Sequence, residues 1–402
     1  MTQQHGCDVV VIGGGATGGM QALALAQQGY RVALVEQAAC PPTSSDPERV
    51  IALSHGSRCY LESLGVWDAL AKHGFGAIRS IEVREPQQHG LMQMDAIEQQ
   101  VDALGYVVEL SHVVQVLYQA LAGKVRMFSA AQVQSWHCDD AGATVHIQHE
   151  GSLKTLSAQL LIAADGTNSQ IRRTAKIPTH GWEHNRFALV TSVQCERGHA
   201  DTAYECFRTS GPLAFLPLAD GRFSIVWALA PQEATRMLQM PKRMFLNRLQ
   251  RAADEAVLPR SGRILDCNRR VCFPLELRVA QSYAAQRMVL IGNAAHTLHP
   301  VAGQGLNLGI RDIEVLTQLC SSDAAQQDVG APIVVQAYAE QRRLDVLAVA
   351  GFTEATLASF GSTSSVVRWL RGKALDGLQL CSPLHQLLVK HAAGVTQGRG
   401  ES

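Results

Sequence analysis

The chain has 402 residues, of which 47% are hydrophobic and 17% are charged. This composition can build a sizeable core and excludes a disordered or low-complexity protein, and the length is typical of two or three domains. Lysine plus arginine balances aspartate plus glutamate at 35 each. A general nucleic-acid binder needs a basic surface, so the zero net charge disfavours that class of function.

Ten cysteines occur without a C-x-x-C pair or a cluster at zinc-ligand spacing. We therefore expect reduced thiols and no metal site. The first six residues lack the positive charge of a signal peptide, and no apolar run approaches the roughly 18 residues of a membrane-spanning helix. These features predict a cytoplasmic protein without a transmembrane helix.

The N-terminal segment has the pattern strand, turn, helix, strand. Residues 7–12 form an apolar run that ends in glycines, residues 16–28 carry Ala and Leu at helical spacing, and residues 31–35 form a second apolar run. Short apolar runs in this order are typical of a parallel sheet with crossover helices.

Later segments alternate between this pattern and a different one. Residues 187–229 contain three strand-like runs and no long helix, which indicates an antiparallel sheet in a separate layer. The other predicted elements are a helix over 57–73, extended chain over 78–94, a helix over 111–121 with Ser111 as its N-cap, strands around 125–148, 159–163 and 288–291, and mostly helix from Leu306 onward. The predicted fold class is α/β: a discontinuous Rossmann-like domain, an inserted antiparallel-sheet substrate domain and a helical C-terminus.

The first chemical motif is the G-x-G-x-x-G run Gly13-Gly14-Gly15-Ala16-Thr17-Gly18, which follows a strand and opens a helix. In this setting Gly13 allows a tight turn, Gly15 lets the backbone approach a pyrophosphate, and Gly18 permits close packing of helix on strand. Glu36, at the end of the next strand, would accept hydrogen bonds from an adenosine ribose. The motif does not separate FAD from NAD, and the alternative is a glycine-rich turn without a ligand.

Two further motifs follow predicted strands. Asp165-Gly166 comes after residues 159–163 and would present its carboxylate at the edge where a dinucleotide binds, although an ordinary turn is the alternative. The run from Gly292 to Gly309 contains Gly303 and Gly305, which would let the backbone lie flat against a planar group. The helix predicted near Leu306 would direct its positive end toward that group and stabilise a reduced, anionic flavin. The alternative is a glycine-rich connection.

Together the three motifs resemble the class A flavin monooxygenases. The run H-P-x-A-G-Q-G-x-N-x-G-x-x-D from His299 to Asp312 is similar to the ubiquinone-biosynthesis hydroxylases, and the similarity spans roughly residues 7 to 345. Asn293 followed by Thr297-Leu298-His299-Pro300 resembles the branch that acts on 2-polyprenyl-6-methoxyphenols. The resemblance implies a fold like that of p-hydroxybenzoate hydroxylase.

This resemblance assigns expected domains. The FAD-binding domain would comprise residues 1–75, 105–180 and 283–345, the substrate domain residues 76–104 and 181–282, and a C-terminal helical region residues 346–402.

It also assigns cofactors and sites. FAD would be bound, and NAD(P)H would be a transient co-substrate. The expected cofactor-binding residues are Gly13, Gly15, Ala16, Thr17, Gly18, Glu36, Arg49, Gln115, Asp165, Gly166, Gly292, Asn293, Pro300, Gly303, Gln304, Gly305, Leu306 and Asn307. The expected catalytic positions are His299, Pro300 and Asn307.

The implied reaction is ring hydroxylation of a polyprenylated phenol by O2 through a flavin C4a-hydroperoxide. His296 and His299 are candidates for the base that deprotonates the phenol, and the alternative is that both are structural. Two other functions stay open: a sister hydroxylase acting at another ring position, and a non-catalytic flavin-fold scaffold of a biosynthetic complex.

The C-terminal tail has apolar residues at near-helical spacing between Val366 and Leu378, with Arg368, Arg371 and Lys373 among them. One interpretation is a surface that docks on the inner membrane, a lipid carrier or a biosynthetic complex. The other is an amphipathic helix that packs on the body of the protein.

Overall fold

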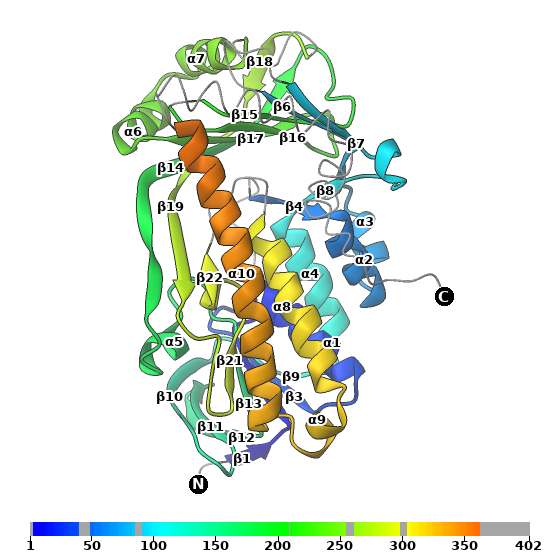
Figure 1. Cartoon of the computed structure of the whole chain (residues 1–402), viewed down its shortest axis with the longest axis vertical. Helices are drawn as coiled ribbons and strands as arrows, with labels where there is room; N and C mark the ends of the chain where they lie inside the picture. Colours follow the sequence, from blue (N-terminus) through cyan, green and yellow to red (C-terminus); the bar gives the residue numbers. More distant parts are fainter. Residues whose placement is uncertain are drawn as a thin grey trace.

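The computed structural model describes residues 3–39, 49–84, 91–208, 210–254, 261–297 and 304–361. Figure 1 shows a lower body of strands and packed helices and an upper body that centres on a large sheet. Two long strands, β14 (Thr179–Cys195) and β19 (Val271–Ala280), run from the lower body into the upper one. The predicted α/β class with an inserted antiparallel sheet is confirmed.

The lower body is built on a six-stranded sheet in the order β20-β21-β13-β2-β3-β9, parallel except at the edge strand β20. Its inner strands are fully buried runs of Val, Ile, Leu, Met and Ala, as expected for a parallel sheet. The strands are β2 (Val9–Ile12), β3 (Val32–Val35), β9 (Arg126–Phe128), β13 (Leu160–Ala163), β20 (Ala284–Ala285) and β21 (Met288–Leu290).

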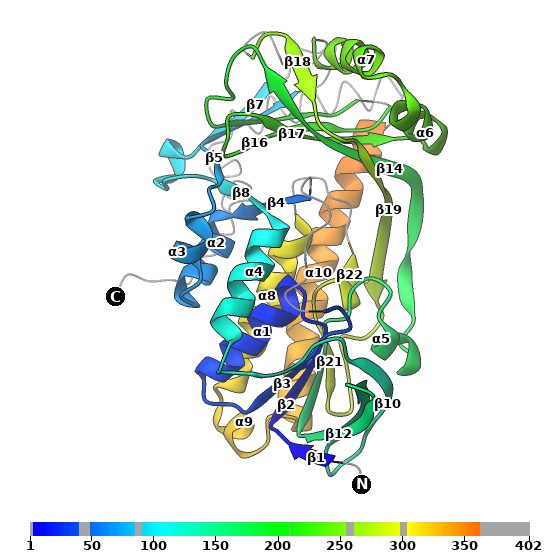
Figure 2. The same ribbon diagram turned by 180° about the vertical axis from the view of Figure 1, so that it is seen from behind.

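Four long helices pack beside this sheet. Helix α1 (Ala16–Gln27) contacts both α4 (Leu110–Leu121) and α8 (Gln304–Cys320), and α8 contacts α10 (Pro332–Gly361). Figure 2 shows α4, α1, α8 and α10 in a row behind one another. The N-terminus of α1 and that of α8 are thereby held in the same part of the molecule.

The upper body is a nine-stranded sheet. Helices α6 (Pro231–Gln239) and α7 (Lys242–Asp254) cover one of its faces, where Phe215 and Phe223 are among the fully buried side chains. We call this the helix-covered face and the opposite one the inner face. Besides β14 and β19, the strands are β6 (Ser80–Arg84), β7 (Leu91–Asp95), β15 (Thr202–Cys206), β16 (Leu213–Pro217), β17 (Phe223–Leu229), β18 (Ile264–Cys267) and β22 (His296–Thr297).

Smaller elements complete the fold. A three-stranded sheet, β4 (Val50–Ser54), β8 (Gly105–Glu109) and β5 (Gly76–Ile78), lies between the two bodies and packs on the inner face. The remaining elements are β1 (Gln3–Gly6), β10 (Gln132–Cys138), β11 (Ala143–His149) and β12 (Ser152–Ala158) in a four-stranded sheet, with α2 (His55–Ser63), α3 (Trp67–Ala71), α5 (Gln170–Thr174), α9 (Asp323–Gln327), η1 (Ile97–Gln99) and η2 (Gly292–Ala294).

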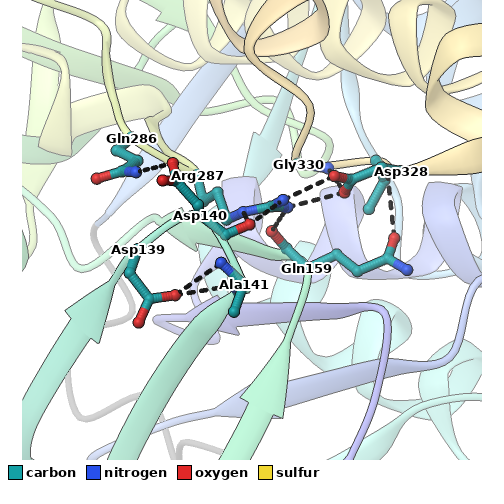
Figure 3. A network of polar contacts seen from close by, with 10 residues as sticks. Asp139, Asp140, Ala141, Gln159, Gln286, Arg287, Asp328 and Gly330 are labelled. Atoms are coloured by element: carbon teal, nitrogen blue, oxygen red, sulfur yellow. Dashed lines mark hydrogen bonds and ion pairs between the residues drawn. The ribbon is translucent and has the colours of Figure 1, made fainter.

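Arg287 ties several lower elements together (Figure 3). Its guanidinium donates to the carbonyl oxygens of Asp140 (2.7 Å) and Gln159 (3.2 Å) and pairs with the Asp328 carboxylate at 2.8 Å. A Cβ at Gly330 would lie 1.9 Å from the Gln159 oxygen, so the chain after α9 passes directly against the start of β13. This network closes the end of the sheet opposite the glycine motifs.

Several predicted elements differ in detail. The helix expected over 57–73 is two helices, because the chain turns at Gly65, whose φ is +71°. Ser111 is not the N-cap: α4 begins at Leu110 after Glu109, which makes no capping side-chain bond. Helix α8 begins at Gln304, two residues before the predicted start. Among the helices of the described residues, none is both long and apolar enough to cross a membrane. The amphipathic run between Val366 and Leu378 lies outside the described residues.

Candidate functional site

The glycine loop after β2 is tightly packed. Gly13 has φ +104°, and a Cβ there would lie 2.4 Å from the carbonyl oxygen of Ala164 at the end of β13. A Cβ at Gly18 would lie 1.9 Å from the Gly13 oxygen. Only glycine allows these two approaches, so α1 starts directly beside the ends of two neighbouring strands.

Gly15 differs from its neighbours. It is exposed at the N-cap of α1, and nothing lies within 4 Å of the position its Cβ would take. The helix has no capping side chain and no acidic residue in its first turn. Its free N–H groups and positive dipole end therefore face open space, which is the arrangement that binds a phosphate.

The next two residues of the motif face inward. Ala16 is buried at the start of α1. The Thr17 side chain fills the space beside Gly292, whose Cβ would come within 2.9 Å of it, and also lies close to Gly309. Thr17 therefore joins the first motif to the third.

Glu36 supports the loop from the end of β3. Its Oε2 accepts the Gly14 N–H at 2.5 Å and its Oε1 accepts the Ala38 N–H at 2.7 Å. The side chain is half-buried. A carboxylate offers about four acceptor positions, so Glu36 can hold the loop and still accept ribose hydroxyls.

Two further expected residues lie outside the three motifs. Arg49 precedes β4, and Gln115 lies in α4 one turn before Tyr118, whose hydroxyl faces Gly14. Both side chains are exposed, and neither forms a hydrogen bond or ion pair with another described residue. Both are therefore available to a ligand.

The second motif also has an unused acceptor. Oδ2 of Asp165 accepts from the backbone nitrogens of Gln170 (2.7 Å) and Ile171 (3.1 Å), while its Oδ1 is buried with no hydrogen-bond partner in the described part of the chain. Gly166, with φ +80°, makes the turn. Leaving a buried acceptor without a partner costs free energy. Oδ1 of Asp165 is therefore suited to a ligand hydroxyl that donates a hydrogen bond to it.

Arg172 connects the second motif to the third. This buried side chain donates to the carbonyl oxygens of Ala294 (2.7 Å) and Thr167 (2.9 Å). Asn293, beside Ala294, is exposed, and its side chain forms no hydrogen bond with another described residue. The three motifs thus meet at the carboxyl ends of β2, β13 and β21, the edge where parallel sheets bind dinucleotides.

A buried ionic network holds the third motif. The Asp312 carboxylate accepts from the Gly292 N–H (2.7 Å), His296 Nε2 (2.7 Å) and Arg342 Nε (2.6 Å). Arg342 also pairs with Asp345 at 2.6 Å. His296 is only 1% exposed and is taken up by this network, which favours its structural interpretation over a role as substrate base.

Burial acts to raise the pKa of Asp312, but the charges of His296 and Arg342 and the hydrogen bonds it accepts outweigh that effect. They hold the pKa of this carboxyl below its usual value. In the sequence Asp312 stands only as the end of a motif, and no local signal marks its partner Arg342.

The start of α8 is anchored to β4. Asn307 Nδ2 donates to the Ala52 oxygen and its Oδ1 accepts from the Ser54 nitrogen, both at 2.9 Å. Leu306 is half-buried, and Gly305 has nothing within 4 Å of the position of a Cβ. The catalytic role of Asn307 stays a prediction. His299, Pro300 and Gly303 lie outside the described residues, and of Gln304 only the helical backbone is described.

The site fits a dinucleotide. An uncapped helix end, an open Gly15 and an unpaired Asp165 oxygen lie along one sheet edge. In the part of the chain that the structure describes, no group of three His, Cys, Asp or Glu side chains is placed to hold a metal ion.

Comparisons with known proteins agree with this geometry. The family described as FAD binding domain matches residues 6–351. A 3-demethoxyubiquinol 3-hydroxylase of Escherichia coli is 32% identical over 401 residues, which covers 98% of this chain and 100% of that protein. The human mitochondrial ubiquinone biosynthesis monooxygenase COQ6 is 29% identical, covering 96% of this chain and 92% of the relative.

Solved structures share the fold. A p-nitrophenol 4-monooxygenase from Pseudomonas putida superposes with a TM-score of 0.79 at 20% identity, covering 100% of both chains. A probable FAD-dependent monooxygenase from Pseudomonas aeruginosa gives a TM-score of 0.75 at 22% identity, over 89% of this chain and 97% of that one. At these identities the likeness establishes the class A monooxygenase fold.

Proposed function

The chain belongs to the family of FAD-dependent ubiquinone-biosynthesis hydroxylases, and from this premise we propose that it hydroxylates the ring of a 2-polyprenyl-6-methoxyphenol. Bound FAD, once reduced by NAD(P)H, supplies the oxygen-activating chemistry. The protein supplies cofactor binding, substrate orientation and exclusion of water. The observation that carries the proposal is the meeting of three motifs at one sheet edge.

Different residues of the described chain would bind different parts of FAD. The N-terminus of α1 at Gly15 would hold the pyrophosphate, and Glu36 the adenosine ribose. Asp165 and Asn293 would take ribityl hydroxyls. Helix α8, anchored through Asn307 to β4, would direct its positive end at the flavin ring and stabilise charge there.

We propose that the nine-stranded sheet with α6 and α7 is the substrate domain. On its inner face Val190, Ala214, Val226 and Val271 follow one another across four strands, and all four are half-buried. The large side chains of the helix-covered face are fully buried by comparison. A small-residue apolar surface that the protein itself covers only in part suits an aromatic ring with a prenyl chain.

The choice of which carbon of the substrate ring is hydroxylated depends on one short stretch of sequence. Asn293 with the run Thr297-Leu298-His299-Pro300 supports the 6-methoxyphenol substrate. The similarity to a 3-demethoxyubiquinol 3-hydroxylase supports a second candidate, hydroxylation of a later intermediate at another position. Either substrate is lipophilic, which is compatible with a peripheral contact of the protein with the membrane.

The test uses the purified FAD-loaded protein, NAD(P)H and ¹⁸O₂ with two probes, 2-prenyl-6-methoxyphenol and a short-chain demethoxyubiquinol. One ¹⁸O atom in the ring of the first probe supports the proposal, and labelling of the second alone supports the second candidate. The same protein without FAD is the control. Absence of label from both rings in a protein that binds FAD would overturn the function.

A cellular experiment checks the pathway independently. In cells that lack the gene, lipid mass spectrometry is expected to show accumulated 2-polyprenyl-6-methoxyphenol and loss of ubiquinone. Accumulation of a different prenylphenol would move the ring position but keep the chemistry. An unchanged quinone profile would contradict the pathway assignment, except where a second hydroxylase compensates. In that case, deleting both genes should cause the loss of ubiquinone.

A further inference from the structure

Glu205 is a carboxylate on the inner face of the large sheet. It lies in β15 between Tyr204 and Cys206, both of which are buried in the core under α6 and α7. Successive side chains of a strand point to opposite faces, so Glu205 points to the inner face.

The strand register places Glu205 at one end of the apolar row. It is directly opposite Ala214 of β16 on one side and Val83 of β6 on the other. Ala214 in turn lies opposite Val226, and Val226 opposite Val190. The proposed ring-binding surface therefore carries a single acidic group along this row.

No described residue pairs with this carboxylate. The charged side chains of the neighbouring strand, Glu82 and Arg84, bond to each other at 2.9 Å and alternate onto the helix-covered face. Four side chains neighbour Glu205 on this face, and none of them titrates: Ala203 of β15, Phe207 just after β15, Val83 of β6 and Ala214 of β16.

The elements packed against the inner face are also apolar here. Val107 of β8 and Ala52 of β4 contact the cluster around Ala203, and Leu104 contacts the cluster around Phe207. Because charged neighbours are absent among the described residues, burial alone raises the pKa of Glu205 to about 7. An acid–base group works best when its pKa is near the working pH.

The same contacts bring Glu205 near the cofactor motifs. Ala203, which lies beside Glu205 on the inner face, belongs to the buried cluster against which Leu216 and Ala52 of β4 pack. The oxygen of Ala52 accepts from Asn307 in the first turn of α8. Strand β4 therefore contacts both the inner face beside Glu205 and the first turn of α8, the helix end expected at the flavin.

We propose that Glu205 is the base that accepts the phenol proton of the substrate, an inference that rests on the proposed function. The phenol O–H bond breaks, the proton forms an O–H bond on the carboxylate, and the electron pair stays on the ring oxygen. The resulting phenolate is a better nucleophile for oxygen transfer. When the hydroxylated carbon releases its proton to solvent water and the ring regains aromaticity, Glu205 returns its own proton to the same ring oxygen.

The test compares wild type with Glu205→Gln and Glu205→Asp, using 2-prenyl-6-methoxyphenol as the probe. Glu196→Gln, which changes an exposed glutamate paired with Arg263, is the matched control. We expect Glu205→Gln to lower kcat for ring oxygenation about 100-fold, typical of a lost general base. FAD affinity and the rate of flavin reduction should not change, and Glu205→Asp should recover part of kcat.

The pH dependence of kcat distinguishes a proton acceptor from a residue that is only structural. Since only the ionised carboxylate accepts a proton, wild-type kcat should rise with pH to a plateau above about 7. The Glu205→Gln variant should lose this rise of kcat with pH, and the Glu196→Gln variant should keep it. An unchanged rise, or a kcat within twofold of wild type, in Glu205→Gln overturns the proposal.

Binding of the probe separates this proposal from the function itself. The ultraviolet difference spectrum of the bound probe at pH 7.5 should show a phenolate band with wild type and none with Glu205→Gln. If wild type forms the band but never oxygenates a ring, the proposed function fails while the role of Glu205 as proton acceptor stands. Binding of only the neutral phenol by wild type, or no binding at all, overturns the role of Glu205.

Discussion

The carboxylate of Asp312 in α8 lies 2.7 Å from the backbone nitrogen of Gly292 and fixes the turn after β21. Gly292 has φ +56°, and its neighbour Asn293 is an expected flavin contact. Arg342 of α10 neutralises the carboxylate from the other side, at 2.6 Å. A helix far along the chain thus determines the shape of a cofactor loop.

Replacing Asp312 with Asn should destabilise the protein by about 3 kcal/mol, because it leaves the buried Arg342 charge without its main partner. FAD affinity should fall as well, since the Gly292 turn loses its charged acceptor. Chemical denaturation and fluorescence titration with FAD measure the two effects. Asp323→Asn, an exposed position in α9, should change the free energy of unfolding by less than about 0.5 kcal/mol. Equal stability of the two variants would contradict this account of the network.

The same pair predicts a pH dependence. His296 and Arg342 hold the pKa of Asp312 below its unfolded value, against the effect of burial. The stabilisation is therefore complete above the unfolded pKa of about 4 and is lost as the pH falls toward the folded pKa. The difference in unfolding free energy between wild type and Asp312→Asn should shrink as the pH falls below about 4. A difference that stays constant from pH 7 to pH 3 would show that the Asp312 charge does not contribute.

Two glycines of one motif should respond in opposite ways. Gly15→Ala should fold with nearly wild-type stability, because its backbone is extended, with φ −67° and ψ −176°, and nothing lies within 4 Å of a Cβ. It should weaken FAD binding about tenfold or more, since the methyl group occupies the phosphate approach. Gly18→Ala should instead unfold at markedly lower denaturant, because its Cβ would lie 1.9 Å from the Gly13 oxygen. Normal FAD affinity in Gly15→Ala would exclude the helix end as the phosphate site.

These contrasts show what the sequence could predict. Gly13, Gly18 and the buried strands leave local signals, because a tight approach requires glycine and a parallel strand requires a continuous apolar run. The turns at Gly166 and Gly292, both with positive φ, could be located for the same reason. The sequence prediction is wrong at two helix boundaries: it runs a helix through the turn at Gly65, whose φ is +71°, and it places the N-cap of α4 at Ser111, although α4 begins at Leu110.

The remaining features depend on contacts between distant residues. Arg342 meets Asp312 only because α10 packs on α8. The direction of Glu205 depends on which face of the sheet α6 and α7 cover. Neither arrangement leaves a pattern near the residue itself, so neither could be read from the sequence.

Asn293 tests the expected ribityl contact. Its side chain is exposed and bonds to no other described residue, so a substitution should leave stability unchanged. Asn293→Ala should lower FAD affinity about two- to tenfold, the value of one hydrogen bond. Asn293→Asp keeps an acceptor and should bind FAD close to wild type. Equal affinity of all three proteins would remove Asn293 from the cofactor site.

Arg172 and Arg173 are neighbours in one helix, but Arg172 is buried and Arg173 is exposed, so substitutions at the two positions can be compared directly. The guanidinium of Arg172 donates hydrogen bonds to the carbonyl oxygens of Ala294 (2.7 Å) and Thr167 (2.9 Å), and so holds the second motif against the third. Arg172→Met should cost about 3 kcal/mol, because two acceptors lose a charged donor inside the protein. It should also weaken FAD binding, since Asp165 and Asn293 lose their relative position. Arg173→Met, next along the helix and exposed, should leave stability and FAD affinity within error of wild type. If both variants behave alike, the link between the motifs is not carried by Arg172.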